Sequence, residues 1–385
     1  MKNPAVFTLS AGPTMATPRT LAALGKPILY HYDPEFLDTF RRVQEKTARV
    51  FKTQNDIVLM QGEAIVALEG AARSMTKPGM KVLNLVQGVF GKGMGYWLKS
   101  FGAEVFELEV AYNEAVNPVD VEKFLSENPG IELVTLVHSE TPSGTITDCE
   151  AIGPMAKRHG ALTLIDAVSS IGGLQFETDK WQLDVVVTGA QKCLGGPPGI
   201  GMVSVSPAAW ERMEENPASP RASYVSLLDW KHKWLEAGAF PFTPSVSDVN
   251  GLESVLDQVL EEGLDNAIER HALAARATRA GAVAMGLELW AADPTIAANC
   301  VTSIRLPDNL DHVEVRAHVR EKYGVMLSSG QGAGNLMRLA HMGPTASGLY
   351  PIVGLAALGR GLKDLGMALN VGAGIDAALE ILAAD

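Results

Sequence analysis

Asp166 and Lys192 are the two residues of this 385-residue chain whose types and positions best suit chemistry on a small ring. Asp166 ends one apolar run, Leu162–Asp166, and Lys192 stands 26 positions later (192 minus 166), just after the next run, Asp184–Thr188. A carboxylate can keep a pyridine nitrogen protonated, which makes the ring an electron sink, and a lysine amine can form an imine with an aldehyde and shuttle a proton. Taken alone, Asp166 could be a helix cap and Lys192 a solvated loop residue. Together, with glycines on both sides of Lys192 that allow a ligand to approach, they favour the chemical interpretation.

Both residues must lie at one edge of a sheet if they are to act together. From about Gly62 to Val205, short β-branched runs alternate with helical stretches, which is typical of a parallel sheet covered on both faces. Ligands of such sheets bind outside the carboxyl ends of the strands, where Asp166 and Lys192 are expected. The pattern predicts strands at Lys81–Val86, Glu104–Val110, Leu133–His138, Leu162–Asp166, Asp184–Thr188 and Gly201–Val205, and helices at Glu63–Ser74, Val119–Glu127 and Glu150–His159.

A second domain is expected in the C-terminal third of the chain. After Pro241-Phe242-Thr243-Pro244 the sequence changes to long Ala/Leu/Glu-rich stretches, which predict helices that leave the sheet. The predicted elements are helices at Gly251–Glu262, Leu264–Met285 and His312–Tyr323 and strands at Cys300–Leu306 and Val325–Ser328. We therefore predict an N-terminal arm and large cofactor-binding domain over residues 1–255 and a small C-terminal domain over residues 256–385.

Composition and charge exclude several classes of function. The formal charge is −12 and Lys and Arg form no run, so the chain lacks the clustered cations that nucleic-acid binding demands. No segment approaches the roughly 18 uncharged apolar residues that span a bilayer, and Met1–Phe7 has no long apolar core. Cys149, Cys193 and Cys300 are too few and too far apart for a disulfide framework or a metal site. We expect a cytoplasmic enzyme that acts on small molecules without a metal.

Three motifs stand out, at Ile165–Ser170, Thr188–Gly199 and Ser10–Thr14. They resemble the class V aminotransferases, the alanine/serine–glyoxylate group, and the resemblance runs over nearly the whole chain. The resemblance implies an α/β fold-type I aminotransferase, in which a large domain with a mainly parallel seven-stranded sheet between helices is followed by a smaller C-terminal α/β domain. It also implies that Lys192 is the imine-forming catalytic lysine, that Asp166 pairs with the ring nitrogen of vitamin B6, and that the protein is a homodimer or homotetramer.

Further motifs resemble an unusual branch of this family that uses free vitamin B6 as a substrate. In other members the turn that holds Glu63 has small residues whose amides and hydroxyls bind the cofactor phosphate. Two like charges about 4 Å apart cost on the order of 4 kcal/mol at an effective dielectric of 20, roughly a thousandfold in affinity. Glu63 therefore predicts pyridoxamine or pyridoxal without phosphate, unless its side chain only interacts with the helix dipole and points away. The motifs are Leu59–Glu63, Gly91–Trp97, Pro220–Ser223 and Arg338–Ala346.

The resemblance also assigns the remaining residues of the site. Arg338 would bind the carboxylate of the oxo acid with two parallel hydrogen bonds, and a surface salt bridge is the alternative. Phe90 would stack on the ring and Val168 would press on its opposite face, with ordinary core packing as the rival interpretation. Thr141 would hydrogen-bond the vitamin or be a plain turn residue, and Gly62 belongs to the turn that binds the cofactor.

The implied reaction transfers the amino group of pyridoxamine to pyruvate and gives pyridoxal and L-alanine. The alternative is a conventional aminotransferase that holds pyridoxal phosphate and acts on alanine, serine or glyoxylate, since Thr188, Gln191 and Thr243 are of types that bind phosphate. A vitamin B6 carrier without turnover is a third hypothesis, against which the presence of both Lys192 and Arg338 speaks.

Two departures from this branch leave the preferred oxo acid open. The branch has a tyrosine at the position of Phe90 and an additional arginine near Gln331. Because sites in this family lie at a dimer interface, Tyr30–Phe36 and Thr243–Ser245 are expected to reach the pocket of a partner subunit.

Overall fold

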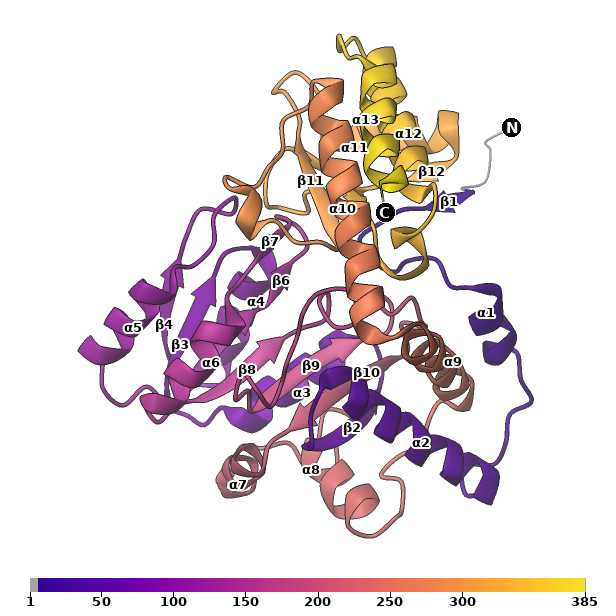
Figure 1. Cartoon of the computed structure of the whole chain (residues 1–385). Coiled ribbons are helices and arrows are strands. Elements are labelled where there is room, and N and C mark those ends of the chain that lie inside the picture. Colours follow the sequence, from indigo (N-terminus) through magenta and orange to yellow (C-terminus); the bar gives the residue numbers. More distant parts are fainter. Residues whose placement is uncertain (1–5, 385) are drawn as a thin grey trace.

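A seven-stranded sheet forms the centre of the larger part of the molecule (Figure 1). The computed structural model describes residues 6–384. The strand order is β2-β10-β9-β8-β5-β3-β4, and only β10 runs antiparallel to its neighbours. The predicted mainly parallel α/β sheet is confirmed. Its strands are β2 (Asp56–Gln61), β3 (Lys81–Val86), β4 (Glu104–Glu109), β5 (Leu133–Val137), β8 (Leu162–Asp166), β9 (Val185–Gly189) and β10 (Ile200–Val205).

The strands follow the apolar runs of the sequence closely. β3 and β8 have the predicted bounds, and the other predicted strands of this sheet differ by one residue at one or both ends. β5, β9 and β10 are buried along their whole length, which explains their continuous apolar sequences. The sequence prediction did not name β2. This strand precedes the alternating part of the chain and pairs only with the antiparallel strand β10.

Helices pack against the sheet from the connections between its strands. α3 contacts β2, β9 and β10, whereas α4 contacts β3, β4 and β5. A short hairpin of β6 (Ser139–Glu140) and β7 (Thr145–Ile146) follows β5. The helices of this part are α1 (Pro18–Leu24), α2 (Pro34–Phe51), α3 (Ala64–Met75), α4 (Val89–Ser100), α5 (Pro118–Glu127), α6 (Cys149–Arg158), α7 (Pro207–Glu215), α8 (Leu227–Asp229) and α9 (Val246–Glu262).

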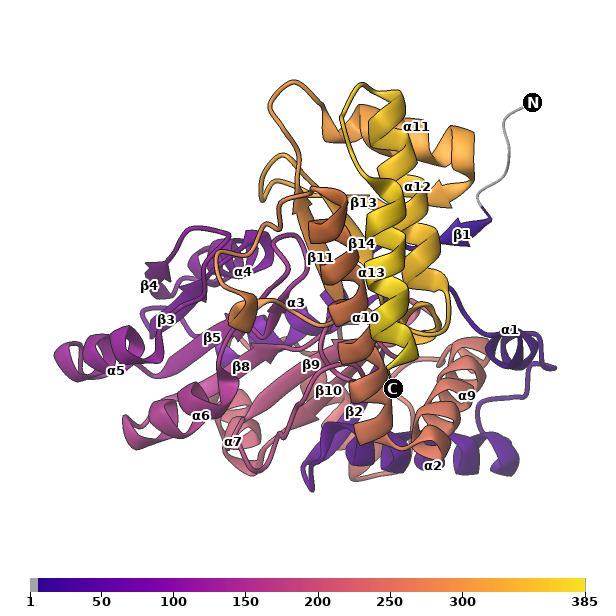
Figure 2. The ribbon, with the colours of Figure 1, turned by 45° about the horizontal axis from the view of Figure 1, so that its top comes forward.

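A smaller unit lies above the large sheet in Figure 2, and α10 (Leu264–Met285) runs from one part to the other. Its antiparallel sheet has the order β11-β14-β13. The predicted strand Val325–Ser328 is divided into β12 and β13, and β12 pairs with β1 near the N-terminus instead of with this sheet. The elements are β1 (Phe7–Thr8), β11 (Val301–Arg305), α11 (His312–Tyr323), β12 (Val325–Met326), β13 (Ser328–Ser329), β14 (Leu336–Ala340), α12 (Tyr350–Asp364) and α13 (Val371–Ala383).

The described residues form two main hydrophobic cores. The larger core surrounds the seven-stranded sheet, and the smaller core lies between the three-stranded sheet and α10, α12 and α13. The predicted boundary between residues 255 and 256 stays a proposal. It falls within α9, whereas the buried side chains pass from the larger to the smaller core within α10, between Ala267 and Ala277.

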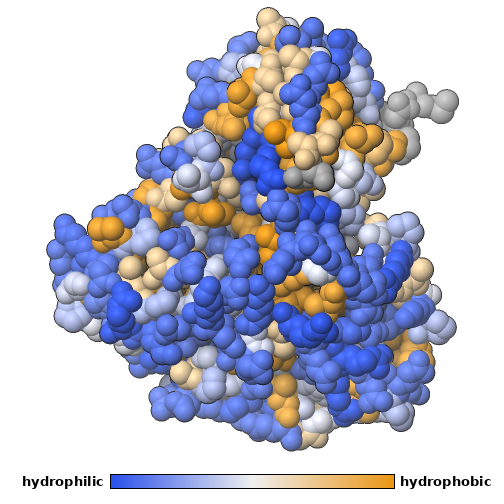
Figure 3. Space-filling view, viewed as in Figure 1, coloured by the Kyte–Doolittle hydropathy of each residue, from blue (hydrophilic) through white to orange (hydrophobic). Residues whose placement is uncertain are grey.

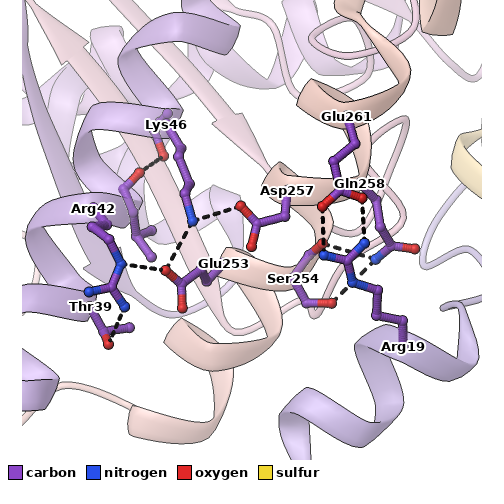
Figure 4. A network of polar contacts seen from close by, with 11 residues as sticks. Arg19, Thr39, Arg42, Lys46, Glu253, Ser254, Asp257, Gln258 and Glu261 are labelled. Carbon is purple, nitrogen blue, oxygen red and sulfur yellow. Dashed lines mark hydrogen bonds and ion pairs between the residues drawn. The ribbon is translucent and has the colours of Figure 1, made fainter.

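A network of charged side chains joins α2 to α9 on the surface (Figure 4). Glu253 accepts hydrogen bonds from Arg42 and Lys46, each at 3.0 Å, and Lys46 also contacts Asp257 at 2.7 Å. The Glu253 side chain is only 13% exposed. Burial opposes its charged form, but the hydrogen bonds and charges of Arg42 and Lys46 outweigh burial and lower its pKa. The network therefore stabilises the packing of α2 on α9 at neutral pH.

We predict that Glu253→Gln lowers the free energy of unfolding by about 1 to 2 kcal/mol at pH 7. A carboxyl group whose pKa is lower in the folded state stabilises the protein above its unfolded pKa and loses this effect as pH falls through the folded pKa. The difference between wild type and variant should therefore shrink below about pH 4, as measured by urea unfolding. Glu211→Gln, at an exposed position of α7, should have no comparable effect; an equal loss in that control would contradict the prediction.

On the face shown in Figure 3, the larger part of the molecule is largely hydrophilic. Hydrophobic residues gather toward the top of the view. Within residues 6–384, no helix is both long and apolar enough to cross a membrane.

Candidate active site

Asp166 and Lys192 come together because β8 and β9 are adjacent parallel strands. Asp166 is the last residue of β8 and pairs with Val187 of β9, and Lys192 lies in the turn that follows β9. Both side chains line one cleft with a volume of about 100 Å³, which leaves room for a small molecule. The cleft is lined by Glu63, Ala64, Ile65, Leu68, Phe90, Val137, Ser139, Asp166, Val168, Ser169 and Lys192.

The Lys192 side chain is held by the N-terminal segment of the chain. Its Nζ donates a hydrogen bond to the carbonyl oxygen of Ala11 at 2.5 Å. Gly12 must lack a side chain, because a Cβ there would lie 2.4 Å from Lys192 Cδ and Gly12 has a φ of +92°. Burial, followed by the charge of Arg338, lowers the pKa of Lys192. A lowered pKa increases the fraction of neutral amine, which is the form that attacks a carbonyl or accepts a proton.

Asp166 is buried, and one of its oxygens serves the local turn. Oδ1 accepts the backbone N–H of Val168 at 2.9 Å. This oxygen therefore caps the turn after β8, as the alternative for Asp166 proposed in part. Within the described chain Oδ2 makes no hydrogen bond, which leaves it able to accept one from a ligand in the cleft. Burial raises the pKa of Asp166 to about 6, with the Val168 amide and Lys192 acting in the opposite direction. A cationic ring nitrogen beside it would restore the charged form.

Glu63 caps α3 and faces the cleft at the same time. Its Oε2 accepts the backbone N–H of Ile65 at 2.9 Å, and its Oε1 accepts Nε2 of Gln191 at 2.5 Å. The side chain is exposed and lines the cleft. Glu63 does interact with the helix terminus, as the alternative proposed. It does not point away from the site, because it lines the cleft. An acidic group occupies the helix N-terminus that opens on the cleft.

Phe90 and Val168 both contribute apolar surface to the cleft. Phe90 is half-buried in the first turn of α4, and Val168 is 8% exposed. A flat ring between them would contact an aromatic face on one side and an aliphatic group on the other. The geometry is compatible with stacking, and the stacking role stays a prediction.

Glu140, which the sequence analysis did not single out, holds the helix turn that carries Phe90. Its fully buried carboxyl group accepts the backbone N–H groups of Gly91 at 2.6 Å and Phe90 at 3.3 Å. It thereby caps α4, because Gly88 at the N-cap offers no side chain, and a Cβ on Gly88 would lie 2.5 Å from Glu140 Cδ. Burial raises the pKa of Glu140 to about 7, and the charge of Asp166 adds to this effect. The signal in the sequence was an acidic residue shortly after the apolar strand Leu133–Val137.

Arg338 lies on β14 of the smaller unit and is 4% exposed. Its Nε donates to the carbonyl oxygen of Ser329 at 2.6 Å, and its Nη2 donates to Oε1 of Gln331 at 3.3 Å. Burial lowers its pKa to about 10. No carboxylate among residues 6–384 pairs with it. The alternative of a surface salt bridge is therefore wrong. Its charge also lowers the pKa of Lys192, which puts Arg338 close to the cleft.

Arg338, Thr141 and Gly62 are the three predicted residues that lie outside the lining of the cleft. Thr141 is buried in the turn between β6 and β7, so its contact with the vitamin stays a prediction. Gly62 precedes Glu63 with a φ of +128°, and its N–H donates to the carbonyl oxygen of Gly199 at 2.8 Å. A Cβ on Gly62 would lie 2.9 Å from Val66, so this glycine shapes the turn that presents Glu63.

Known proteins resemble the chain along its whole length. Residues 6–347 match the family model described as aminotransferase class-V. The chain belongs to the class V aminotransferase family. It is 46% identical over 382 residues to a pyridoxamine–pyruvate transaminase from Mesorhizobium japonicum, a comparison that covers 99% of this chain and 97% of that protein.

Solved structures extend this comparison to the fold. A crystal structure of pyridoxamine–pyruvate aminotransferase from Mesorhizobium loti superposes on this class V aminotransferase with a TM-score of 0.97 and 45% identity, with 100% of both chains covered. Ureidoglycine–glyoxylate aminotransferase from Bacillus subtilis gives a TM-score of 0.94 at 27% identity and covers 100% of this chain and 99% of its own. The predicted fold-type I architecture and the aminotransferase class are thereby confirmed.

The contacts of Glu140 lead to a prediction about this aminotransferase. Glu140→Ala leaves two buried N–H groups without acceptors, so we expect a loss of about 2 to 3 kcal/mol in stability and weaker binding of aromatic ligands beside Phe90. Glu140→Gln keeps an acceptor and should retain most of the stability and most of the affinity for aromatic ligands. Thermal unfolding and ligand titration of both variants test this; equal behaviour of the two would contradict the cap.

The pH dependence supplies a second readout for the same residue. A carboxyl group whose pKa is raised to about 7 by folding favours the folded state more as pH falls from 8 toward 5, because the folded protein then binds the extra proton. Wild type should therefore gain up to about 3 kcal/mol relative to Glu140→Gln over this range.

Proposed function

We propose that this aminotransferase moves the amino group of pyridoxamine to pyruvate and forms pyridoxal and L-alanine. The observation that carries the proposal is the carboxylate of Glu63 at the N-terminus of α3, on the wall of the cleft that holds Asp166 and Lys192. The high identity to a protein named pyridoxamine–pyruvate transaminase supports it.

The chain itself occupies the groups that would bind a phosphate. The Ile65 N–H is taken by Glu63, Gln191 Nε2 also donates to Glu63, and Thr188 Oγ1 donates to the carbonyl oxygen of Ala167 at 3.0 Å. A phosphate dianion at this position would have to displace these contacts and approach a carboxylate. The electrostatic cost of about 4 kcal/mol at 4 Å favours the unphosphorylated vitamin.

Four residues of the cleft have a task in this proposal. When it is bound, a vitamin B6 ring supplies an electron sink. Asp166 holds a proton on the ring nitrogen through its free Oδ2. Lys192 Nζ takes a proton from the amino-bearing carbon of pyridoxamine and delivers one to the central carbon of the oxo acid. Phe90 and Val168 hold the ring between them.

Arg338 binds and orients the oxo acid in this proposal. Its guanidinium is buried without a carboxylate partner among the described residues, and burying an unpaired charge is costly. A substrate carboxylate would compensate this charge with two hydrogen bonds. Gln331, which already accepts one bond from Arg338, lies beside this position and can influence which oxo acid fits.

A conventional reaction with bound pyridoxal phosphate is the second candidate. The observation that favours it is the family itself, since class V members typically depend on that cofactor, and the matched Bacillus subtilis enzyme is named for glyoxylate. The two candidates differ in a visible property, because protein that holds pyridoxal phosphate permanently is yellow when purified without added vitamin.

The first test is an assay of purified protein with pyridoxamine and pyruvate. We expect equal amounts of pyridoxal and alanine, and we expect Lys192→Ala to lower the rate by at least about a thousandfold because it removes the proton carrier. Lys180→Ala, at an exposed position, is the control and should be fully active. Colourless protein that makes no alanine at saturating substrate would reject the proposal, and yellow protein active only with other amino donors would establish the second candidate.

The second test concerns the charge of Glu63. Glu63→Ser should raise the ratio of activity with pyridoxamine phosphate to activity with pyridoxamine by at least about tenfold, because the like-charge repulsion is removed. Glu63→Gln is the matched variant, since its amide oxygen can still cap Ile65 without carrying a charge. The ratio of kcat/KM values for the two amines is the measurement; a ratio that changes in neither variant would show that Glu63 does not select against phosphate.

We further propose that the enzyme works as a cytoplasmic homo-oligomer. Ile28–His31 and Thr243–Ser247 line one surface recess together, and Ile28 and Tyr30 are 76% and 67% exposed. Exposed apolar residues of this size are suited to contact with another subunit. The three cysteines are free and buried, which is suited to a reducing compartment.

A further inference from the structure

A second small recess lies where the smaller unit meets the β6–β7 hairpin, on strand β11 next to β14. Its volume of about 40 Å³ leaves room for only a few atoms, since a single water needs roughly 10 to 15 Å³ on the same measure. Backbone contacts close one side of this recess. The Ala298 N–H donates to Gly144 O at 2.8 Å, and Thr145 forms a β-bridge with Ala297. The recess is lined by Ser143, Gly144, Arg279, Leu289, Ala291, Pro294, Ala297, Val301, Thr302 and Ser303.

Arg279 brings an uncompensated positive charge to this recess. It lies on α10, and its guanidinium makes one hydrogen bond, from Nη2 to the carbonyl oxygen of Ala298 at 2.5 Å. No carboxylate in residues 6–384 pairs with it, whereas most other arginines of the chain form ion pairs, as Arg270 does with Glu262. Burial lowers the pKa of Arg279, as it does for Arg338. Arg279 is partly buried, and a cation that is partly desolvated without a counter-charge is costly to the fold.

Ser303 adds an unused hydroxyl group to the same recess. The residue is 6% exposed, and its buried Oγ has no hydrogen-bond partner in the described structure. The space in front of this oxygen is open because the neighbouring residue is glycine: a Cβ on Gly144 would lie 2.7 Å from Ser303 Oγ. Buried hydroxyl groups are normally satisfied, so an orphaned one beside an unpaired arginine points to a missing acceptor.

We propose that the recess formed by Arg279, Ser303 and Gly144 binds a small carboxylate anion. Four of the five N–H groups of the guanidinium are unused, and a planar carboxylate can accept two of them in parallel. The Ser303 hydroxyl donates a further hydrogen bond to the same anion. The recess is too small for the vitamin together with an oxo acid, and no carboxylate among residues 6–384 lines it.

The position of the recess gives the anion a structural effect. Arg279 belongs to the helix that joins the two units, Gly144 to the larger unit, and Ser303 to the smaller unit, where it pairs across the sheet with Arg338. One anion would therefore hold three elements together beside the strand that carries Arg338. A ligand that binds only the folded protein raises its stability by mass action.

The test uses acetate as the probe in Arg338→Gln protein, so that acetate binding to Arg338 does not contribute. We expect a saturable rise in Tm with acetate at constant ionic strength, and an apparent Kd that weakens by at least about tenfold when Arg279→Gln is added, since it removes the charge-assisted bonds. Adding Ser303→Ala instead should weaken the apparent Kd for acetate about threefold. This variant tests the proposal if the Arg279→Gln protein folds poorly. Arg360→Gln, at an exposed position of α12, is the control and should leave the Kd unchanged.

Crystals soaked in sodium bromide or sodium acetate locate the site directly. We expect acetate density between Arg279 and Ser303, lost in Arg279→Gln. Absence of saturable binding, or acetate binding that neither Arg279→Gln nor Ser303→Ala weakens, would overturn the proposal. Bromide in the recess without any binding of acetate would overturn the assignment of a carboxylate.

Discussion

The pairing of β8 with β9 is the constraint on which the active site depends. Parallel strands end at the same edge of a sheet, and the register that sets Asp166 opposite Val187 brings the turn after β9 to the side of Asp166. The carboxylate and the amine of Lys192 then share one cleft although 25 residues separate them in the chain. The apolar strands provide the positions, and the polar residues just beyond them provide the chemistry.

Charge is unevenly compensated around this cleft. Asp166 and Glu140 are buried carboxyl groups whose pKa values are raised by burial, and each keeps backbone N–H groups as partners. Glu63 is different, because it is exposed and accepts two hydrogen bonds at the N-terminus of α3. Helix N-termini attract anions in general. Here a residue of the chain already satisfies that attraction, which is the physical basis of the proposal that the vitamin binds without a phosphate.

The arginines show the opposite situation. Arg338 is buried and Arg279 is partly buried on the side of the smaller unit, and neither pairs with a carboxylate among residues 6–384. Natural proteins rarely bury a cation without a partner, so such positions indicate anions that come from solution. Arg338 is proposed to bind a substrate carboxylate, whereas Arg279 lines a second recess together with Ser303, the cross-strand neighbour of Arg338.

Local apolar periodicity and the common edge of parallel strands were enough to predict six strands of the large sheet, six of the helices and the pairing of Asp166 with Lys192. Helix α10 and strand β8 could be read directly in this way. The tertiary structure alone decided the place of β2, the division of Val325–Ser328 between two sheets, the role of Glu140 and the isolation of Arg279. Those features depend on which distant groups face one another, and the hydrogen bonds or charges that a side chain lacks cannot be known until its neighbours are in place.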